Sequence, residues 1–146
     1  MKKILKLITP LLATLFLLTA CSSEKTKEFI KNSDGHDIKA TLYYKGETVN
    51  KVVTNSTLTT NAAHLDSTLD GIKSTISQKP NFDGYTRSAE IKDGKVVITT
   101  EIDYDKLDFE RYKGRVHLSG SDTLENERKL ETVEYHLKDA GATEKK

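Results

Sequence analysis

The stretch YTRSAEIKDGKVVITTEIDY, residues 85–104, decides the fold class. In its first half, residues 85, 87, 89 and 91 form one set of side chains, and the polar residues 86, 88 and 90 alternate with them. In its second half, residues 96, 98, 100, 102 and 104 alternate in the same way with residues 97, 99, 101 and 103. This period of two is typical of half-buried β-strands. The dipeptide Asp93-Gly94 separates the two halves and can adopt the positive φ angles that a two-residue hairpin turn needs. The stretch therefore predicts an antiparallel hairpin.

Two further strands are predicted upstream of this hairpin. Residues 26–31 form the first, with Phe29 or Ile30 facing the core. The dipeptide Asp34-Gly35 then supplies a tight turn. Residues 38–45 alternate with a period of two and predict the second half-buried strand.

A third strand begins near Thr48, after a turn at Lys45-Gly46. The adjacent pair Val52-Val53 breaks the alternation, so a β-bulge or a stretch buried on both sides is expected there. Residues 55–60 are polar and β-branched, and they either extend this strand or form a loop.

An amphipathic helix follows from Asn61, because apolar residues then recur at helical spacing. Its stripe consists of Leu65, Leu69, Ile72 and Ile76. Pro80 ends it near Gln78 or Lys79, since the residue before a proline disfavours the helical region.

A second helix is predicted near the C-terminus, with Asp122 and Glu125 as its capping pair and Gly141 as its C-cap. Its apolar stripe is Leu130, Val133, Leu137 and Ala140. Residues 105–112 predict only a short helical turn, with Leu107 and either Phe109 or Tyr112 tucked in. Residues 114–120 are expected to be irregular and residues 142–146 a polar tail.

The resulting order β-β-β-α-β-β-α predicts an α+β domain. It consists of an antiparallel sheet of about five strands with the helices packed on one face. The expected apolar face of the sheet carries Ile38, Leu42, Ile91, Ile98 and Ile102.

Residues 1–20 have the layout of a secretory signal peptide: three lysines precede a short apolar run, residues 7–18. The run is shorter than the roughly 20 residues that a membrane-spanning helix needs. An uncleaved membrane anchor is the alternative, and Pro10 together with the short run argues against it.

The leader ends in Leu18-Thr19-Ala20-Cys21, which resembles the bacterial lipobox. The resemblance implies cleavage between Ala20 and Cys21, a diacylglyceryl group on the Cys21 thiol and, in many bacteria, acylation of the new amine. Two acyl chains suffice for stable membrane anchoring where one does not. Cys21 is the only cysteine, so the chain can form no internal disulfide. The alternative is a free cysteine in a generic leader.

The predicted mature chain therefore has a lipidated tether, residues 21–25, and a single domain, residues 26–146. The 23 Lys and Arg residues include the three lysines of the leader, which leaves 20 against 22 Asp and Glu. Nucleic-acid-binding domains are usually strongly basic, so this balance gives no sign of a nucleic-acid partner.

Four segments carry a family resemblance: the lipobox, the turn Tyr43-Tyr44-Lys45-Gly46-Glu47, the run at residues 103–108 and the segment Leu118-Ser119-Gly120. Together they resemble the YehR-type family of small bacterial lipoproteins. The resemblance implies an α+β fold and a lipid anchor, but no activity and no catalytic residues. It also implies an edge strand with an aromatic residue after the last glycine. Residues 142–146 contain no aromatic residue, which leaves that strand open.

Neither the histidines nor the densest group of acids predicts a metal site. His36, His64, His117 and His136 lack the close spacing of metal ligands and are expected to be exposed. The acidic run at residues 103–108 lacks the glycine and distal glutamate of a calcium loop. Its acids are expected to end a strand and cap a helix.

Ser119 and Ser121 lack the glycine pattern of a nucleophile elbow and are expected in turns or caps. No catalytic residue is therefore predicted.

The outer face of the sheet is the remaining candidate site. Tyr43 and Val97 are expected to point away from the helices, near Thr99 and Glu101. An uncovered face with an aromatic residue can bind a partner, although isolated apolar residues are ordinary on any surface.

The sequence therefore favours a lipid-anchored, extracytoplasmic lipoprotein that binds a protein, a peptide or an envelope component. It would sit on the bacterial cell membrane, or on the outer membrane if the host has two. Its expected partners are the membrane, the lipoprotein-processing enzymes and a protein or peptide, and no cofactor is expected besides the lipid on Cys21. The alternatives are a small cell-envelope hydrolase and a structural or stress-associated lipoprotein without catalysis.

Overall fold

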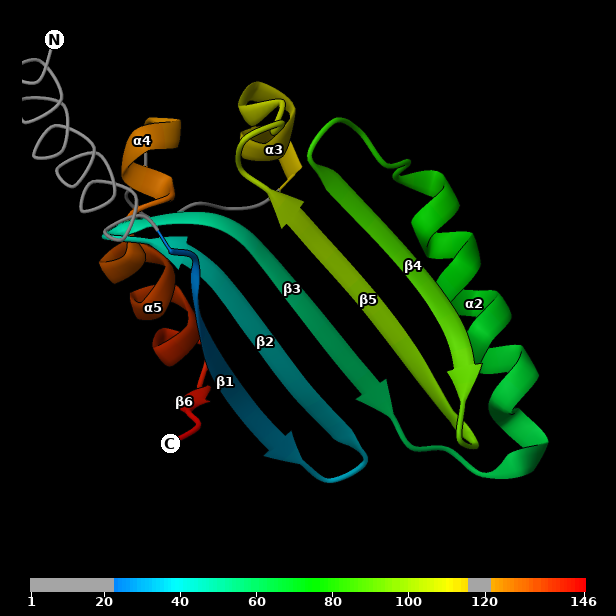
Figure 1. The fold of residues 1–146 in the computed structure, drawn as a ribbon. Helices are drawn as coiled ribbons and strands as arrows, with labels where there is room; N and C mark the ends of the chain where they lie inside the picture. Colours follow the sequence, from blue (N-terminus) through cyan, green and yellow to red (C-terminus); the bar gives the residue numbers. More distant parts are fainter. Residues whose placement is uncertain (1–22, 116–121) are drawn as a thin grey trace, which may run out of the picture.

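The computed structural model describes residues 23–115 and 122–146, and it confirms the α+β fold. One antiparallel sheet has the strand order β4-β5-β3-β2-β1-β6 (Figure 1). The strands are β1 (Lys25–Ser33), β2 (His36–Lys45), β3 (Thr48–Leu58), β4 (Tyr85–Lys92), β5 (Lys95–Asp103) and β6 (Thr143–Glu144). The helices are α2 (Leu65–Gln78), α3 (Phe109–Arg115), α4 (Leu124–Glu127) and α5 (Leu130–Asp139), and the 3-10 turn η2 (Ala62–His64) precedes α2.

The central hairpin β4–β5 forms as predicted, with Lys92 paired to Lys95 around the turn. Asp93 and Gly94 have φ angles of +52° and +72°, which match the left-handed values that a two-residue hairpin requires. Residues 55–58 extend β3 and pair with both β2 and β5, so this part of the chain is strand rather than loop.

The β-bulge in β3 is not at Val52-Val53, where the sequence predicted it. The register shifts where Tyr43 pairs with Lys51 and Tyr44 with Val49, so Asn50 is the extra residue. The extra residue lets Val49 and Val52, three positions apart, both face the core, whereas Val53 lies on the opposite face in the row of Thr41 and Glu101.

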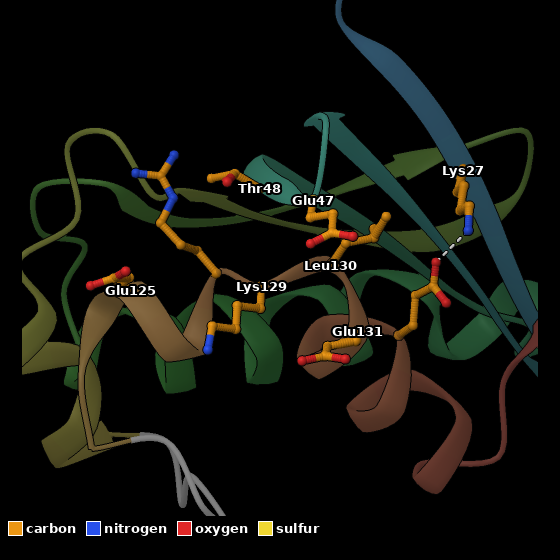
Figure 2. A pocket seen from close by; sticks show the side chains of 9 residues that line it. Lys27, Glu47, Thr48, Glu125, Lys129, Leu130 and Glu131 are labelled. Carbon is orange, nitrogen blue, oxygen red and sulfur yellow. Dashed lines mark hydrogen bonds and ion pairs between the residues drawn. The ribbon is translucent and has the colours of Figure 1, made fainter.

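All the helices pack on one face of the sheet, as predicted. Lys27 and Lys31 of β1 contact α5 through Glu134 and Ala140, so α5 lies on the face to which their side chains point. In Figure 2 the coils of α2 lie on the same side of the strands as those of α5. The largest fully buried side chains are Phe29, Leu42, Val49 and Val96.

The predicted C-terminal helix is wrong in its extent: it is two helices, α4 and α5. Thr123, not Asp122, is the N-cap of α4 and accepts a hydrogen bond from the Asn126 amide. The break at residues 128–129 pairs with the β2–β3 turn, because Val49 N–H donates to Arg128 C=O and Leu130 N–H donates to Glu47 C=O. These strand-like bonds to β3 compete with a continuous helix.

Ile91 lies on the predicted apolar face, opposite the buried Val96, but it is 38% exposed. Leu42 is fully buried, and Ile38, Ile98 and Ile102 are half-buried. Ile91 is exposed because it lies on the edge strand β4, where α2 gives incomplete cover: no residue of α2 is buried.

The sheet has six strands instead of about five, because the C-terminal tail adds β6 beside β1 (Figure 1). Gly141 has a φ of +89°, which turns the chain back after α5, and Ala142 is then buried. Lys145 N–H donates to the Glu28 C=O of β1, so the tail is held by main-chain bonds and needs no aromatic side chain.

Candidate functional site

The face of the sheet opposite the helices is open in the described part of the chain. Its side chains are polar or charged at most positions. Three rows run across the inner strands: Thr41, Val53 and Glu101; Lys39, Asn55 and Thr99; and Asp37, Thr57 and Val97. The Thr99 hydroxyl lies 3.0 Å from the Asn55 side-chain oxygen and donates to it.

The four predicted surface residues all lie on this open face, but they do not form one patch. Tyr43 is in the same row as Lys51, and Val97 pairs with Thr57, six residues further along β3. At about 3.3 Å per residue, roughly 20 Å separates these two rows. The Lys51 ammonium also lies 5.1 Å from the centre of the Tyr43 ring, so the ring already has a cationic neighbour.

Val97 and Thr99 line a shallow hollow of about 400 Å³ on the open face. The other residues around it are Asn55, Thr57, Glu90, Lys92, Asp93 and Lys95. The hollow lies beside the β4–β5 turn. Thr57 pairs with Asp37, which follows the β1–β2 turn, whereas Lys25 at the start of β1 lies at the other end of the strands. The hollow is therefore at the end of the open face that is furthest from Lys25.

A second hollow of about 520 Å³ lies where α5 meets β1 and the β2–β3 turn (Figure 2). Within it the Lys27 ammonium is 2.5 Å from a carboxylate oxygen of Glu134. Burial alone would raise the pKa of Glu134, but the hydrogen bond and charge of Lys27, helped by Lys138, bring that pKa below its ordinary value. The same hydrogen bond raises the pKa of Lys27. This pair joins the first strand to the last helix.

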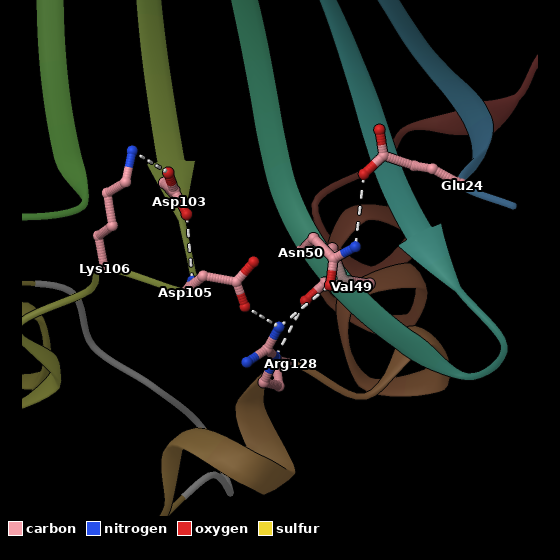
Figure 3. A network of polar contacts seen from close by, with 7 residues as sticks. All are labelled: Glu24, Val49, Asn50, Asp103, Asp105, Lys106 and Arg128. Atoms are coloured by element: carbon pink, nitrogen blue, oxygen red, sulfur yellow. Dashed lines mark hydrogen bonds and ion pairs between the residues drawn. The ribbon is translucent and has the colours of Figure 1, made fainter. Parts of the chain in front are cut away.

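Arg128 is the centre of a polar network at the same end of the sheet (Figure 3). Its guanidinium donates to the Val49 C=O at 3.1 Å, to the Asn50 side chain at 3.2 Å and to the Asp105 carboxylate at 2.7 Å. Asn50 also donates to Glu24, just before β1. The network fixes the β3 bulge against the loop after β5.

The acids at residues 103–108 have the structural roles that the sequence predicted. Asp103 accepts a hydrogen bond from the Asp105 amide and pairs with Lys106 at 3.3 Å. Asp108 accepts a hydrogen bond from the Arg111 amide and so caps α3. No group of three potential metal-ligating side chains is present among the residues that the structure describes.

Sequence reasoning missed a buried glutamate, Glu127, whose exposure is 3%. Its Oε2 atom lies 3.7 Å from His136 Nε2, and neither of these two buried atoms has a hydrogen-bond partner. Burial raises the pKa values of the nearby phenols of Tyr104 and Tyr112, and the Glu127 charge raises both further. The expectation that every histidine is exposed is therefore wrong for His136, and His36 also bonds to Ser56. Helical spacing gave no signal, because Glu127 and His136 belong to two separate helices.

Several predicted residues lie outside the described part of the chain. They are Ala20, Cys21, His117, Ser119 and Ser121. Within the described part, no helix is long and apolar enough to cross a membrane.

Residues 25–143 match a family described as "Protein of unknown function (DUF1307)". The chain belongs to this family. The match runs from the start of β1 to the start of β6, so the family shares the whole described domain.

Two relatives in Listeria are named as uncharacterised lipoproteins. The chain is 28% identical to Lin0239 of Listeria innocua, over 88% of this chain and 86% of the relative. It is 33% identical to Lmo0207 of Listeria monocytogenes, over 64% of each chain.

Two solved structures share the fold. The Escherichia coli YehR protein has a TM-score of 0.68 at 22% identity, over 84% of this chain and 91% of YehR. A Streptococcus pneumoniae protein has a TM-score of 0.53 at 17% identity, over 84% of this chain and 86% of that protein. The chain therefore shares the fold of YehR, as the short sequence motifs indicated.

Proposed function

We propose that this protein is a lipid-anchored, extracytoplasmic binding module that performs no catalysis and carries no cofactor besides the lipid on Cys21. Its domain presents the open sheet face to a protein, a peptide or an envelope component. The observation that carries the proposal is the open face itself, which no helix covers in the described residues and which is hollowed at Val97 and Thr99. The names of the Listeria lipoproteins support the anchor.

The short tether gives this face an orientation. Only three residues separate Cys21 from Lys25, the first residue of β1. An extended chain spans at most about 3.5 Å per residue, so Lys25 would lie within roughly 15 Å of the lipid. The hollow lies at the opposite end of the strands, about 25 Å along them at 3.3 Å per residue. The proposed binding surface is thus tethered near the membrane, with its hollow at the end of the strands furthest from the tether.

Lipid attachment is tested by the Cys21→Ser variant. Membrane retention should be lost, because the thioether and the second acyl chain both depend on this residue. The measurement is the fraction of protein in the membrane pellet and the mass of the processed chain. Equal retention and equal processing of the variant would contradict the anchor.

The binding face is tested by photo-crosslinking in intact cells, with the crosslinking residue placed at Val97. The matched control carries it at Ser74, an exposed position on α2 at the helical side of the sheet. Specific products should form from Val97 and be reduced by Thr99→Arg, which fills the hollow. Identical products from both positions, or from a chain consisting of the lipidated tether alone, would refute binding at this face.

A further inference from the structure

The outer edge of β4 is capped along half of its length and open along the other half. Phe82 exchanges main-chain hydrogen bonds with Tyr85, and the Asn81 side chain bonds to both the N–H and the C=O of Arg87. Alternate residues of an edge strand direct their backbone groups outward. Because β4 keeps one continuous register with β5, Ala89 and Ile91 also direct theirs outward. Among the described residues, none bonds to these outward groups.

The apolar side chains of α2, the helix that packs against this edge, remain partly exposed to solvent. Helix α2 packs mainly against β4 and less against β5, and it lies along the outer side of β4 in Figure 1. Its apolar stripe of Leu65, Leu69, Ile72 and Ile76 is only half-buried, and Ile91 next to it is 38% exposed. One more strand beside β4 would cover both the stripe and Ile91.

The chemistry of the edge determines what that strand can be. Its side chains on the helical side would face Ile91 and α2, so they must be apolar. The residue between them would lie opposite Glu90, which is exposed and has no ion-pair partner in the described chain. A cross-strand neighbour of opposite charge is stabilising and one of like charge is destabilising.

A second copy of this chain does not satisfy these requirements. If β4 of one copy paired with β4 of another so that Ala89 faced Ile91, the two Glu90 side chains would lie directly opposite each other, and like charges in that position are destabilising. A register with Ile91 opposite Ile91 would pair Glu90 with Lys92, but Ala89 would then lie opposite Asp93, a charged turn residue with a φ of +52° that lies beyond the end of the strand. The occupant must therefore supply a basic residue where this chain has an acidic one.

We propose that the distal edge of β4, at Ala89 and Ile91, binds an extended segment of a partner protein as an added strand. The segment carries two apolar residues on either side of a lysine or arginine. Main-chain hydrogen bonds hold it to Ala89 and Ile91, the apolar residues cover α2, and the basic residue pairs with Glu90. The main-chain edge of β4 is distinct from the open face of the proposed function, although the Glu90 side chain also borders the hollow on that face.

The probe is a blocked pentapeptide, threonine-valine-lysine-valine-threonine, with a glutamate peptide of otherwise identical sequence as its control. The lipidated full-length protein in detergent should bind the lysine peptide about fivefold more tightly than the glutamate peptide. Hydrogen exchange should show new protection at Ala89 and Ile91.

Two variants separate the proposal from its alternatives. Ala89→Pro removes an outward N–H without removing a bond to β5, and it should weaken binding by at least about tenfold. Glu90→Lys should reverse the preference in favour of the glutamate peptide, whereas Glu131→Lys makes the same charge change on α5 and should leave the preference unaltered.

Equal affinity of the wild type and Ala89→Pro, or an unchanged preference in Glu90→Lys, would overturn the proposal. Either result would leave the proposed function standing, because crosslinking from Val97 is measured on a chain in which Ala89 and Glu90 are unchanged.

Discussion

The two halves of the sheet are covered by helices in different ways. The half formed by β1, β2 and β3 packs against α5, and most of the fully buried side chains lie there, including Phe29, Leu42 and Val49. The half formed by β4 and β5 packs against α2, which has no buried residue, and Val96 is its one fully buried large side chain in the described chain. Because burial of apolar surface is the main stabilising contribution, the first half should carry most of the stability. The second half is held less firmly and offers an edge to a partner.

The largest predicted contrast concerns one leucine in each half. Leu42→Ala should lower the free energy of unfolding by about 3.5 kcal/mol, because Leu42 is fully buried and its removal leaves a cavity. Leu69→Ala in the half-buried stripe of α2 should cost only about 1 kcal/mol by the area that it loses. Urea unfolding of both variants measures the difference. Equal losses would mean that the two halves are equally well packed.

The two ends of β4 should also respond differently to a methyl group. Gly84 and Gly94 both have positive φ angles, of +73° and +72°. A Cβ on Gly84 would lie 2.4 Å from the Leu107 Cα, whereas a Cβ on Gly94 would meet nothing within 4 Å. Gly84→Ala should therefore cost about 3 kcal/mol, and Gly94→Ala about 1 kcal/mol for backbone strain alone. Similar melting temperatures of the two variants would contradict the tight anchoring of β4 at its first end.

The ion pair between Lys27 and Glu134 should make the first half sensitive to acid. The pKa of Glu134 is lower in the folded chain than in the unfolded chain. The unfolded state therefore binds a proton first as the pH falls, and stability is lost from about pH 5 down through the folded-state pKa.

Replacing Glu134 with glutamine should cost about 1 kcal/mol at neutral pH and nothing below the folded-state pKa, since the pair is only partly buried and water screens it. Thermal unfolding between acid and neutral pH measures this loss, with Glu131→Gln on the exposed side of α5 as the control. If the difference in unfolding free energy between wild type and Glu134→Gln did not change with pH, the ionisation of Glu134 would not be coupled to folding.

The smallest predicted effect is at the capped part of the β4 edge. Asn81→Ala removes the two side-chain bonds to the Arg87 backbone, which are exposed to water and worth about 0.5–1 kcal/mol together. The Arg87 amide should then exchange with solvent as fast as those of Ala89 and Ile91. An Arg87 amide that stays protected in this variant would show that something else covers the edge.

The β-strands could be predicted because their signals are local. The alternation in residues 85–104 and the turn at Asp93-Gly94 predict the hairpin directly, and the apolar stripe from Leu65 to Ile76 predicts α2. The β-bulge at Asn50 and the interruption between α4 and α5 at residues 128–129 are linked by main-chain hydrogen bonds between segments that are distant in the sequence. No local pattern reports such bonds, and the sequence left β6 open for the same reason.

The candidate sites were predicted less completely than the fold. Alternation placed Tyr43, Val97, Thr99 and Glu101 on the open face, but only the pairing of β3 with β2 and β5 shows that Tyr43 is far from Val97. The edge at Ala89 was not predictable, because strand order decides which strand is at the edge. The buried pair of Glu127 and His136 requires the tertiary packing of two helices.

Native-state hydrogen exchange on the lipidated protein tests most directly whether the half of the domain around β4, β5 and α2 is less stable than the half around β1, β2, β3 and α5. The account predicts that the amides of α2 exchange through a partial opening whose free energy is at least about 2 kcal/mol below that of the amides in β2 and α5. Exchange of α2, β2 and α5 at one common free energy would contradict it, because the domain would then open only as a whole.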